Sequence, residues 1–374
     1  MEKKHISAAI ILIAAAVISI ITGRQFLAKH YPETFYPSPG LTRTGKLSDY
    51  FSGLQGTEND SRVYFFEGEE EGSTVLLLGG THPNEAASGL VAVLVLENVE
   101  VTVGRLIVIP RANRSGFTVN DPMEAHPQYY SIPTPNGERR FKYGSRLTSP
   151  LDQWPDPLVY SHRPSGQRLS GFETRNLNRA YPGRPDGSLT EKTAYGIVQL
   201  IKKENVNVAF DLHEAAPEIP IINAIVYHEK AEEVALNAIF ELEMEGISVS
   251  PELSPSNFHG LSHREWGDYT DVYPFLMETS NPIQGRLRGE TSAELIVEGV
   301  SPEYRMALES GALQIAYKET GEPIERRVAR HVTCFRRVIE AYNQLGNKPV
   351  ILENLPEYED ILQNGVGAYI VAGK

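Results

Sequence analysis

Continuous apolar runs alternate with amphipathic segments along most of the chain. Residues 74–80 (TVLLLGG) and 105–111 (RLIVIPR) have the composition typical of strands that are buried on both faces. The segment between them, 84–99, is long enough for a helix, so the order predicts a strand, a right-handed crossover and a parallel strand. Further strands are expected at 62–66, 206–212, 224–228 and 271–277, and further helices at 190–204, 230–245 and 324–345. The pattern therefore predicts an α/β fold with a mixed or parallel sheet covered by helices.

The first 23 residues form the most apolar stretch of the chain. Lys3 and Lys4 precede an uncharged run of 18 residues, 6–23, that is rich in Ile and Ala. A run of this length just spans a bilayer, and the lysines favour a cytoplasmic N-terminus. No small-x-small cleavage site follows the run. We therefore expect a signal anchor at 1–23, with a cleaved signal peptide as the alternative, and an extracytoplasmic remainder at the cytoplasmic membrane.

The rest of the chain divides by composition. Residues 24–60 are rich in Pro, Gly and Tyr and are expected to form a linker and entry segment. Residues 61–374 are expected to form one catalytic domain. Within it, residues 118–174 lack periodicity and are dense in proline and aromatic residues. A loop of this length is usually a lid or a binding loop, and the alternative is a surface insertion that packs on itself.

The overall composition excludes several classes of protein. A hydrophobic content of 41% and a charged content of 22% are ordinary for a globular chain and exclude disorder or many membrane spans. The net charge of −13 argues against nucleic acid as a partner, because phosphate binding needs a basic face. The single cysteine, Cys334, excludes an internal disulfide and a cysteine-cluster metal site. It lies in a predicted helix and is expected to be a small core residue.

Candidate metal ligands follow two of the predicted strands. The run 74–80 leads directly into Thr-His-Pro-Asn-Glu, which places His82 and Glu85 at the carboxyl end of a strand, where α/β sheets bind ligands. His213 lies at the end of another apolar strand (VAFDLHE). If the two strands are neighbours, the three side chains converge. Two imidazoles and one carboxylate are a common catalytic zinc set, whereas a single histidine at a strand end is more often structural.

Two further motifs carry polar residues that suit substrate chemistry. The segment NLNRAYPG contains Asn178 and Arg179, an amide and a guanidinium that suit a carboxylate. Its alternative is an ordinary turn with an exposed arginine. Glu278 ends the strand in FLMETS and would serve as general base and acid beside a metal. Its alternative is a strand-end carboxylate that faces solvent.

The ordered set GGTHPNE, NLNRAYPG, DLHE and FLMET resembles the succinylglutamate desuccinylase/aspartoacylase family, which is related to the zinc carboxypeptidases. The resemblance implies a carboxypeptidase-like three-layer α/β/α sandwich around a mixed, largely parallel sheet. It implies one zinc ion held by His82, Glu85 and His213, and Glu278 as the residue that activates water. It also implies that Asn178 and Arg179 bind the substrate carboxylate or the scissile carbonyl.

The chain departs from the family pattern at three points. Asn176 stands where the family has an aspartate that supports the first zinc histidine, and Asp211 is a candidate to compensate. An additional substrate-binding arginine of the family aligns with no residue cleanly, and Arg168 and Arg175 are preferred over Arg163. The third departure is the long segment 118–174, which is expected to border the pocket and to alter specificity.

Three functions remain open at this stage. The resemblance implies a zinc-dependent hydrolase of an amide bond in a carboxylate-bearing small molecule or peptide, and an N-acyl amino acid deacylase is the leading expectation. The alternative is a zinc carboxypeptidase that acts on peptides, including cell-wall peptides because of the external location. The third is a binding module that has kept the fold without catalysis, and Asn176 is its only support.

Overall fold

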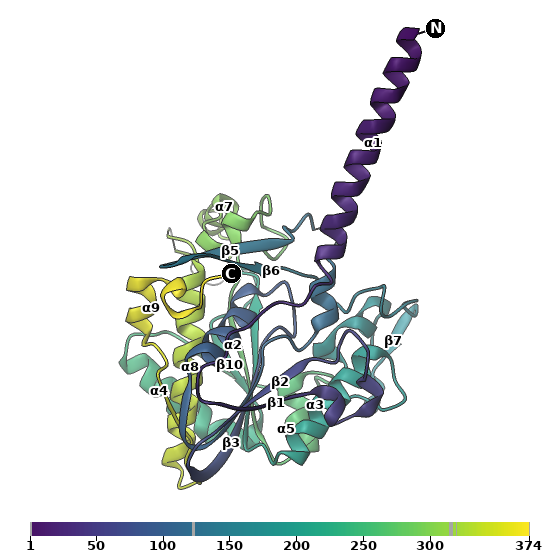
Figure 1. Ribbon diagram of the computed structural model, residues 1–374. Helices are drawn as coiled ribbons and strands as arrows, with labels where there is room; N and C mark the ends of the chain where they lie inside the picture. The colour runs from purple at the N-terminus through teal and green to yellow at the C-terminus, as the bar shows by residue number, and fades with distance from the viewer. Residues whose placement is uncertain (1, 122–123, 314–316, 319, 374) are drawn as a thin grey trace. The chain divides into compact units, whose positions relative to one another are not determined.

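The computed structural model describes residues 2–121, 124–313, 317–318 and 320–373. Its contacts divide the chain into two units, Met1–Thr34 and Phe35–Lys374 (Figure 1). The first unit is dominated by helix α1 (Glu2–Ala28). Within residues 4–28, the most apolar window of 18 residues has a mean hydropathy of 2.5, and none of that window is buried. By length and composition this helix is able to cross a membrane, and a signal sequence has the same properties.

The second unit is built on a nine-stranded mixed sheet. The strand order is β1-β2-β4-β3-β9-β12-β10-β11, and β13 pairs with β4. The neighbouring pairs β4–β3, β3–β9 and β9–β12 are parallel, and so is β10–β11. Antiparallel pairs join β1 to β2, β2 to β4, β12 to β10 and β13 to β4.

The bounds of these strands are β1 Leu41–Lys46, β2 Arg62–Glu67, β3 Glu70–Leu78, β4 Glu100–Ile109, β9 Val208–Ala215, β10 Ala224–Tyr227, β11 Ser250–Leu253, β12 Tyr273–Ser280 and β13 Ile351–Glu353. The helices of this unit are α2 Ala86–Asn98, α3 Leu189–Lys203, α4 Glu232–Met244, α5 Ser262–Tyr269, α6 Ala293–Glu298, α7 Pro302–Glu309, α8 Ile324–Gln344 and α9 Tyr358–Asn364.

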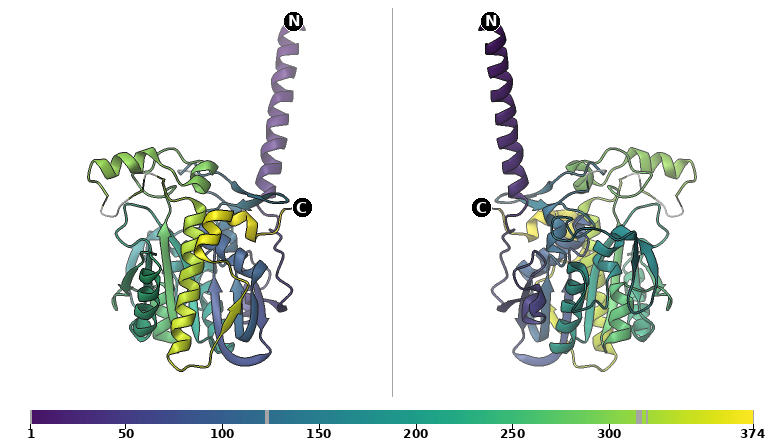
Figure 2. Two further views of the ribbon diagram at one scale, coloured as in Figure 1. Left: turned by 90° about the vertical axis from the view of Figure 1, so that its left-hand side faces the viewer. Right: turned by 90° about the vertical axis from the view of Figure 1, so that its right-hand side faces the viewer.

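Helices cover both faces of the sheet. Alternate side chains of one strand enter different cores: Val75 and Leu77 pack with α2, α4 and α8, whereas Leu76 and Leu78 pack with α3 and Trp266 of α5. Figure 1 shows the two groups of helices on opposite sides of the sheet, and Figure 2 shows α8 running along the strands. The expected three-layer α/β/α sandwich around a mixed, largely parallel sheet is therefore confirmed.

The expected strands and helices of the sandwich all occur within a few residues of their expected positions. The crossover from β3 through α2 to β4 joins two parallel strands. Cys334 is buried in α8, as expected of a small core residue. Residues 41–46, inside the segment expected to be a linker, form β1 at the sheet edge. Their largely exposed polar side chains gave no apolar signal for this strand.

The described part of the segment 118–174 forms two small hairpins and the start of a short 3-10 helix, Gly171–Arg175. The hairpins are β5 (Tyr129–Thr134) with β6 (Gly137–Lys142), and β7 (Val159–Ser161) with β8 (Arg168–Ser170). Tyr130 and Phe141 face each other across the first hairpin and are buried. Pro122 and Met123, at the start of the segment, lie outside the described residues.

Candidate metal centre and active site

The turn after β3 fixes the position of the first two candidate ligands. Gly80 has a φ of +68°, and a Cβ atom on Gly79 would lie 2.6 Å from Cβ of Ala92 in α2. Glycine at both positions allows the chain to turn sharply while α2 packs against the end of β3. His82 follows this turn, and Glu85 is the residue that caps α2.

The third candidate ligand arrives from the neighbouring strand. β9 lies beside β3 in parallel, with Leu78 opposite Asp211, so His213 lies just beyond the end of β3. The two strands are therefore neighbours, which is the arrangement that brings the three candidate ligands together. His82, Glu85 and His213 are all buried, and their donor atoms lie within 4.8 Å of one another.

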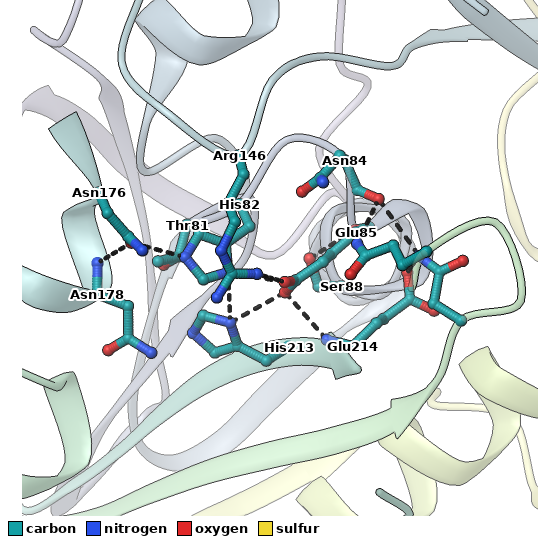
Figure 3. A network of polar contacts seen from close by, with 12 residues as sticks. Thr81, His82, Asn84, Glu85, Ser88, Arg146, Asn176, Asn178, His213 and Glu214 are labelled. Carbon is teal, nitrogen blue, oxygen red and sulfur yellow. Dashed lines mark hydrogen bonds and ion pairs between the residues drawn. The ribbon is translucent and has the colours of Figure 1, made fainter. Parts of the chain in front are cut away.

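The three side chains face one point (Figure 3). Nδ1 of His82 lies 2.7 Å from Oε1 of Glu85, and Nδ1 of His213 lies 2.9 Å from Oε2 of the same carboxylate. The two Nδ1 atoms are 3.1 Å apart. Each imidazole thus presents the same nitrogen to the centre and leaves Nε2 for a partner behind it.

The partners behind the two imidazoles differ in charge. Nε2 of His82 lies 2.9 Å from Oδ1 of Asn176, a neutral amide. The amide nitrogen of Asn176 donates a 2.7 Å hydrogen bond to the carboxylate of Glu173. Nε2 of His213 lies 3.0 Å from Oδ2 of Asp211, a carboxylate. Asp211 therefore supports His213 and does not replace the missing aspartate behind His82.

The protonation equilibria follow from burial and from these partners. Burial and the nearby Arg146 lower the pKa of His82 to about 4. Burial acts in the same direction on His213, but Asp211 and Glu85 outweigh it and raise the pKa to about 10. Burial opposes ionisation of Glu85, yet the two histidines hold its pKa well below the usual range.

The chemistry of this donor set fits a zinc ion. Imidazole nitrogen and carboxylate oxygen are the donors that catalytic zinc sites use. Polar groups lie behind both imidazoles, 2.9 Å from Nε2 of His82 and 3.0 Å from Nε2 of His213, as is usual for histidine ligands.

Glu278 lies on the next strand, opposite His213 in the register of β9 and β12. Burial, together with the nearby negative charges of Glu85 and Asp211, raises the pKa of its carboxyl to about 8. Within the described part of the chain, its Oε2 atom finds no hydrogen-bond donor. With a raised pKa and one oxygen without a partner, this carboxyl has the properties of a group that transfers protons.

A cavity of about 540 Å³ lies beside the candidate metal centre, and His82 and Glu85 are not among the described residues that line it. His213, Glu278, Asn178 and Arg179 all line it. The side-chain oxygen of Asn178 accepts a hydrogen bond of 2.8 Å from the backbone of Ser262, which orients the amide. The structure thus brings together the histidine, glutamate, asparagine and arginine positions that separate sequence motifs indicated.

The two additional arginine candidates lie elsewhere. Arg175 forms an ion pair with Asp156 at 2.8 Å, and Arg168 is exposed on β8. Neither is among the described residues that line the cavity. Arg146, which no motif singled out, does line it, and its guanidinium lies 2.9 Å from Oε1 of Glu85. The only signal for Arg146 was its place in the segment 118–174, which was expected to border the pocket.

The sequence motifs did not indicate two further residues of the site, Glu173 and His263. Glu173 lies three residues before Asn176 and contacts it. His263, which lies outside the four motifs and within 20 residues before Glu278, lines the cavity, and burial lowers its pKa to about 3. Its Nδ1 atom has no hydrogen-bond partner among the described residues.

A second group of potential donors occurs at His228, Glu229 and Asp268. Arg264 lies within contact distance of all three side chains, including 2.8 Å to Glu229 and 2.7 Å to Asp268. The guanidinium already supplies the positive charge there, so this group does not call for a metal.

Comparisons with known proteins agree with the resemblance in the motifs. No family model matches the chain. It is 28% identical over 161 residues to N-alpha-acetyl-L-2,4-diaminobutyric acid deacetylase of Halomonas elongata, a match that covers 42% of this chain and 33% of that protein. The chain therefore spans about a third of the length of this curated relative.

The similar solved structures share little sequence with this chain. A succinylglutamate desuccinylase from Silicibacter sp. TM1040 is 17% identical, with a TM-score of 0.41, over 79% of this chain and 64% of that one. The tripeptide-bound cell shape determinant Csd4 from Helicobacter pylori is 12% identical, with a TM-score of 0.46, over 81% and 60%. The chain is thus similar to part of a deacetylase in sequence, and to a succinylglutamate desuccinylase and to Csd4 in fold.

Proposed function

We propose that this chain is a zinc-dependent hydrolase of an amide bond in a carboxylate-bearing substrate, and specifically an N-acyl amino acid deacylase. One observation carries the proposal: three buried zinc-type donors, from the turn after β3, the N-cap of α2 and β9, lie within 4.8 Å of one another, and His213 among them lines one cavity with the half-buried Glu278 of β12. The proposal assigns His82, Glu85 and His213 as the ligands of one zinc ion. The similarity to a deacetylase over 161 residues supports the choice of deacylation.

The chain's own residues divide the chemistry between them. A zinc ion in such a site supplies Lewis-acid chemistry, polarising a carbonyl and making water a usable nucleophile near neutral pH. Glu278 takes a proton from the attacking water at its unpartnered Oε2 and returns a proton to the leaving nitrogen. The carbon–nitrogen bond breaks, water is consumed, and the products are a carboxylic acid and an amine.

The substrate is positioned by the polar groups on the same wall. Arg179 and the oriented amide of Asn178 bind the substrate carboxylate or the carbonyl oxygen. Arg146 serves as the second arginine in place of Arg168 and Arg175, because it reaches the cavity. His263 offers a neutral imidazole to a polar group of the substrate.

We also propose that α1 anchors the chain to the cytoplasmic membrane with the catalytic unit outside. The helix has the length and composition of a span, and two lysines precede its apolar run. A cleaved export signal is the alternative, and it would leave the catalytic unit in the same compartment.

The first test is hydrolysis by the zinc-loaded chain. The protein is incubated with a pool of N-acyl amino acids and short peptides, with and without a chelator, and products are identified by mass spectrometry. We expect release of small acids and free amino acids that stops when the chelator removes the metal. Stepwise loss of C-terminal residues from the peptides would instead establish a carboxypeptidase.

Two variants separate the proposed roles. Glu278→Gln should retain zinc and lose roughly 10²–10⁴-fold in kcat, because the group that moves the proton is gone. His82→Ala should lose zinc, measured as metal per chain by elemental analysis. Activity retained by Glu278→Gln would remove Glu278 from the mechanism, and full metal occupancy in His82→Ala would remove that ligand.

A further inference from the structure

The cavity continues past Glu278 along the sheet. In the register of the strands, His213 lies opposite Glu278 of β12. Two residues earlier on β12, Leu276 lies opposite Val226 of β10. Val226 in turn lies opposite Glu252 of β11. The metal donors thus lie at the β3 and β9 end of this row of strands, and the cavity extends from there across β12 to β10 and β11.

The part of the cavity over β12, β10 and β11 is lined mainly by hydrocarbon. We call this part the apolar compartment; it is lined by Ile219, Ile221, Val226, Leu253, Phe258 and Leu276. Leu276 and Val226 are buried and form its floor. The others come from the segment before β10, the end of β11 and the segment after it.

Four of these side chains are exposed to an extent that is unfavourable without a ligand. The exposed fractions are 44% for Ile219, 42% for Ile221, 51% for Leu253 and 41% for Phe258. Clustered apolar exposure at the wall of a cavity marks a binding surface. Burying these side chains against a hydrocarbon chain would stabilise a complex by removing apolar area from water.

The charges in the cavity are distributed unevenly. The arginines among the described lining residues are Arg146 and Arg179. Arg146 contacts Glu85, on the metal side, and Arg179 lies with its guanidinium 5.7 Å from the ring of Phe258, at the edge of the apolar compartment. The ionisable residue on the far side is Glu252 of β11. A second carboxylate on the acyl group, as in a succinyl group, would therefore approach a negative charge there.

The connectivity of an N-acyl amino acid decides which group enters the apolar compartment. The carboxylate and the side chain of the amino acid are both on the amine side of the scissile bond, whereas the acyl chain is on the other side. If the carboxylate binds Arg146 on the metal side and the carbonyl lies at His213 and Glu278, the acyl chain extends towards β10 and β11. The volume of about 540 Å³ lies in the range of pockets that enclose ligands much larger than an acetyl group.

We propose, on the basis of the function proposed above, that the substrates are amino acids acylated with an apolar chain longer than acetyl, for which the apolar compartment is the acyl site. Each added methylene that enters the site gains about 0.8 kcal/mol, which corresponds to about a fourfold gain in affinity. Hexanoyl substrates, with four more methylenes, are therefore bound on the order of 200-fold more tightly than acetyl substrates. Succinyl substrates are disfavoured by Glu252.

The experiment measures binding separately from turnover. The full chain in detergent, loaded with zinc, is prepared as wild type and as Glu278→Gln. The ligands are the acetyl, butanoyl, hexanoyl and succinyl derivatives of the same set of amino acids. They are titrated into Glu278→Gln by calorimetry, and their hydrolysis is assayed with the wild type. We expect affinity and kcat/KM to rise from acetyl to hexanoyl and the succinyl derivatives to rank below butanoyl.

Variants of the apolar compartment are compared with a matched control variant outside it. Ile221→Ser and Leu253→Ser should each lower the hexanoyl-to-acetyl ratio of affinities about fivefold or more, because a hydroxyl replaces hydrocarbon in the wall. Leu236→Ser is the control, since Leu236 is 44% exposed on α4 and is not a lining residue. This control should leave the ratio unchanged.

The outcomes distinguish this proposal from the proposed function. Length-dependent binding without hydrolysis would support the apolar compartment and overturn the hydrolase. Hydrolysis with equal affinity for acetyl and hexanoyl derivatives would overturn the acyl site and leave the hydrolase standing. A preference for peptides with an apolar C-terminal residue, with no effect of acyl length, would place the amine-side group in the compartment and also overturn the acyl site.

Discussion

Asn176 brings a neutral amide to His82 at a position where an aspartate would bring a charge. The amide is not isolated, because Glu173 accepts its hydrogen bond at 2.7 Å and so fixes Oδ1 towards His82. The same oxygen accepts from the backbone nitrogen of Asn178 at 3.0 Å. The carboxylate of Glu173 thus lies behind the amide of Asn176 and does not touch the imidazole of His82. The amide still orients the imidazole ring.

This arrangement predicts an unusual change in zinc affinity when Asn176 is replaced with aspartate. Asn176→Asp should not tighten zinc, because the new carboxylate would contact Glu173, and two carboxylates at this distance force one of them to hold a proton. Asn176→Asp combined with Glu173→Gln should tighten zinc on the order of tenfold, since a charged partner then faces His82. Competition with a fluorescent chelator measures both affinities. The idea fails if the single change strengthens zinc binding as much as the double change.

At the scale of elements, α2 positions Glu85, and its own position depends on the Gly79–Gly80 turn. All residues from Ala86 to Glu97 are buried, so α2 has no exposed face and cannot shift without disturbing the core. The buried carboxylate of Glu214, next to His213, accepts a 2.9 Å hydrogen bond from the backbone of Ala87 and pairs with Arg327 of α8 at 2.8 Å. The start of α2 is therefore tied to β9 and α8 beside the candidate ligands.

Gly79→Ala should disturb this packing. The added Cβ atom would lie 2.6 Å from Cβ of Ala92 and 2.8 Å from the carbonyl oxygen of Ser88, so α2 must move. We expect a loss of roughly 1–3 kcal/mol in the free energy of unfolding, measured with urea, together with weaker zinc binding. Gly40→Ala is the control, because its Cβ would meet its nearest atom at an ordinary 3.6 Å. Equal stability of both variants would contradict the importance of this close approach.

At the scale of the whole molecule, the chain combines an apolar helix with a separate α/β unit. We expect the full chain to sediment with membranes and to resist extraction with alkaline carbonate, because a helix that spans the bilayer is not released by removal of surface charges. A variant without residues 2–28 should be found in the soluble fraction. Recovery of a soluble mature chain whose N-terminus follows the apolar run would establish a cleaved signal peptide instead.

The sequence by itself determined the layers and the strand-end chemistry. Apolar runs such as 74–80 report burial locally, and a residue that follows such a run lies at the carboxyl end of a strand, which is how His82, His213 and Glu278 were found. The Asn-Arg pair was found because its motif is compact. These predictions rest on periodicity and short-range order, which need no knowledge of distant contacts.

Only the tertiary structure decided which groups stand around these residues. The order β3-β9-β12 brings His82, His213 and Glu278 together from positions up to about 200 residues apart, and strand order is not written in any single strand. Arg146 lies in a segment without periodicity, so its approach to Glu85 left no pattern, whereas Arg175 is held by Asp156. Asp211 supports His213 instead of His82 because of the direction in which β9 presents it. The apolar compartment likewise exists only where β12, β10 and β11 align, because its wall is assembled from segments that are separate in the chain.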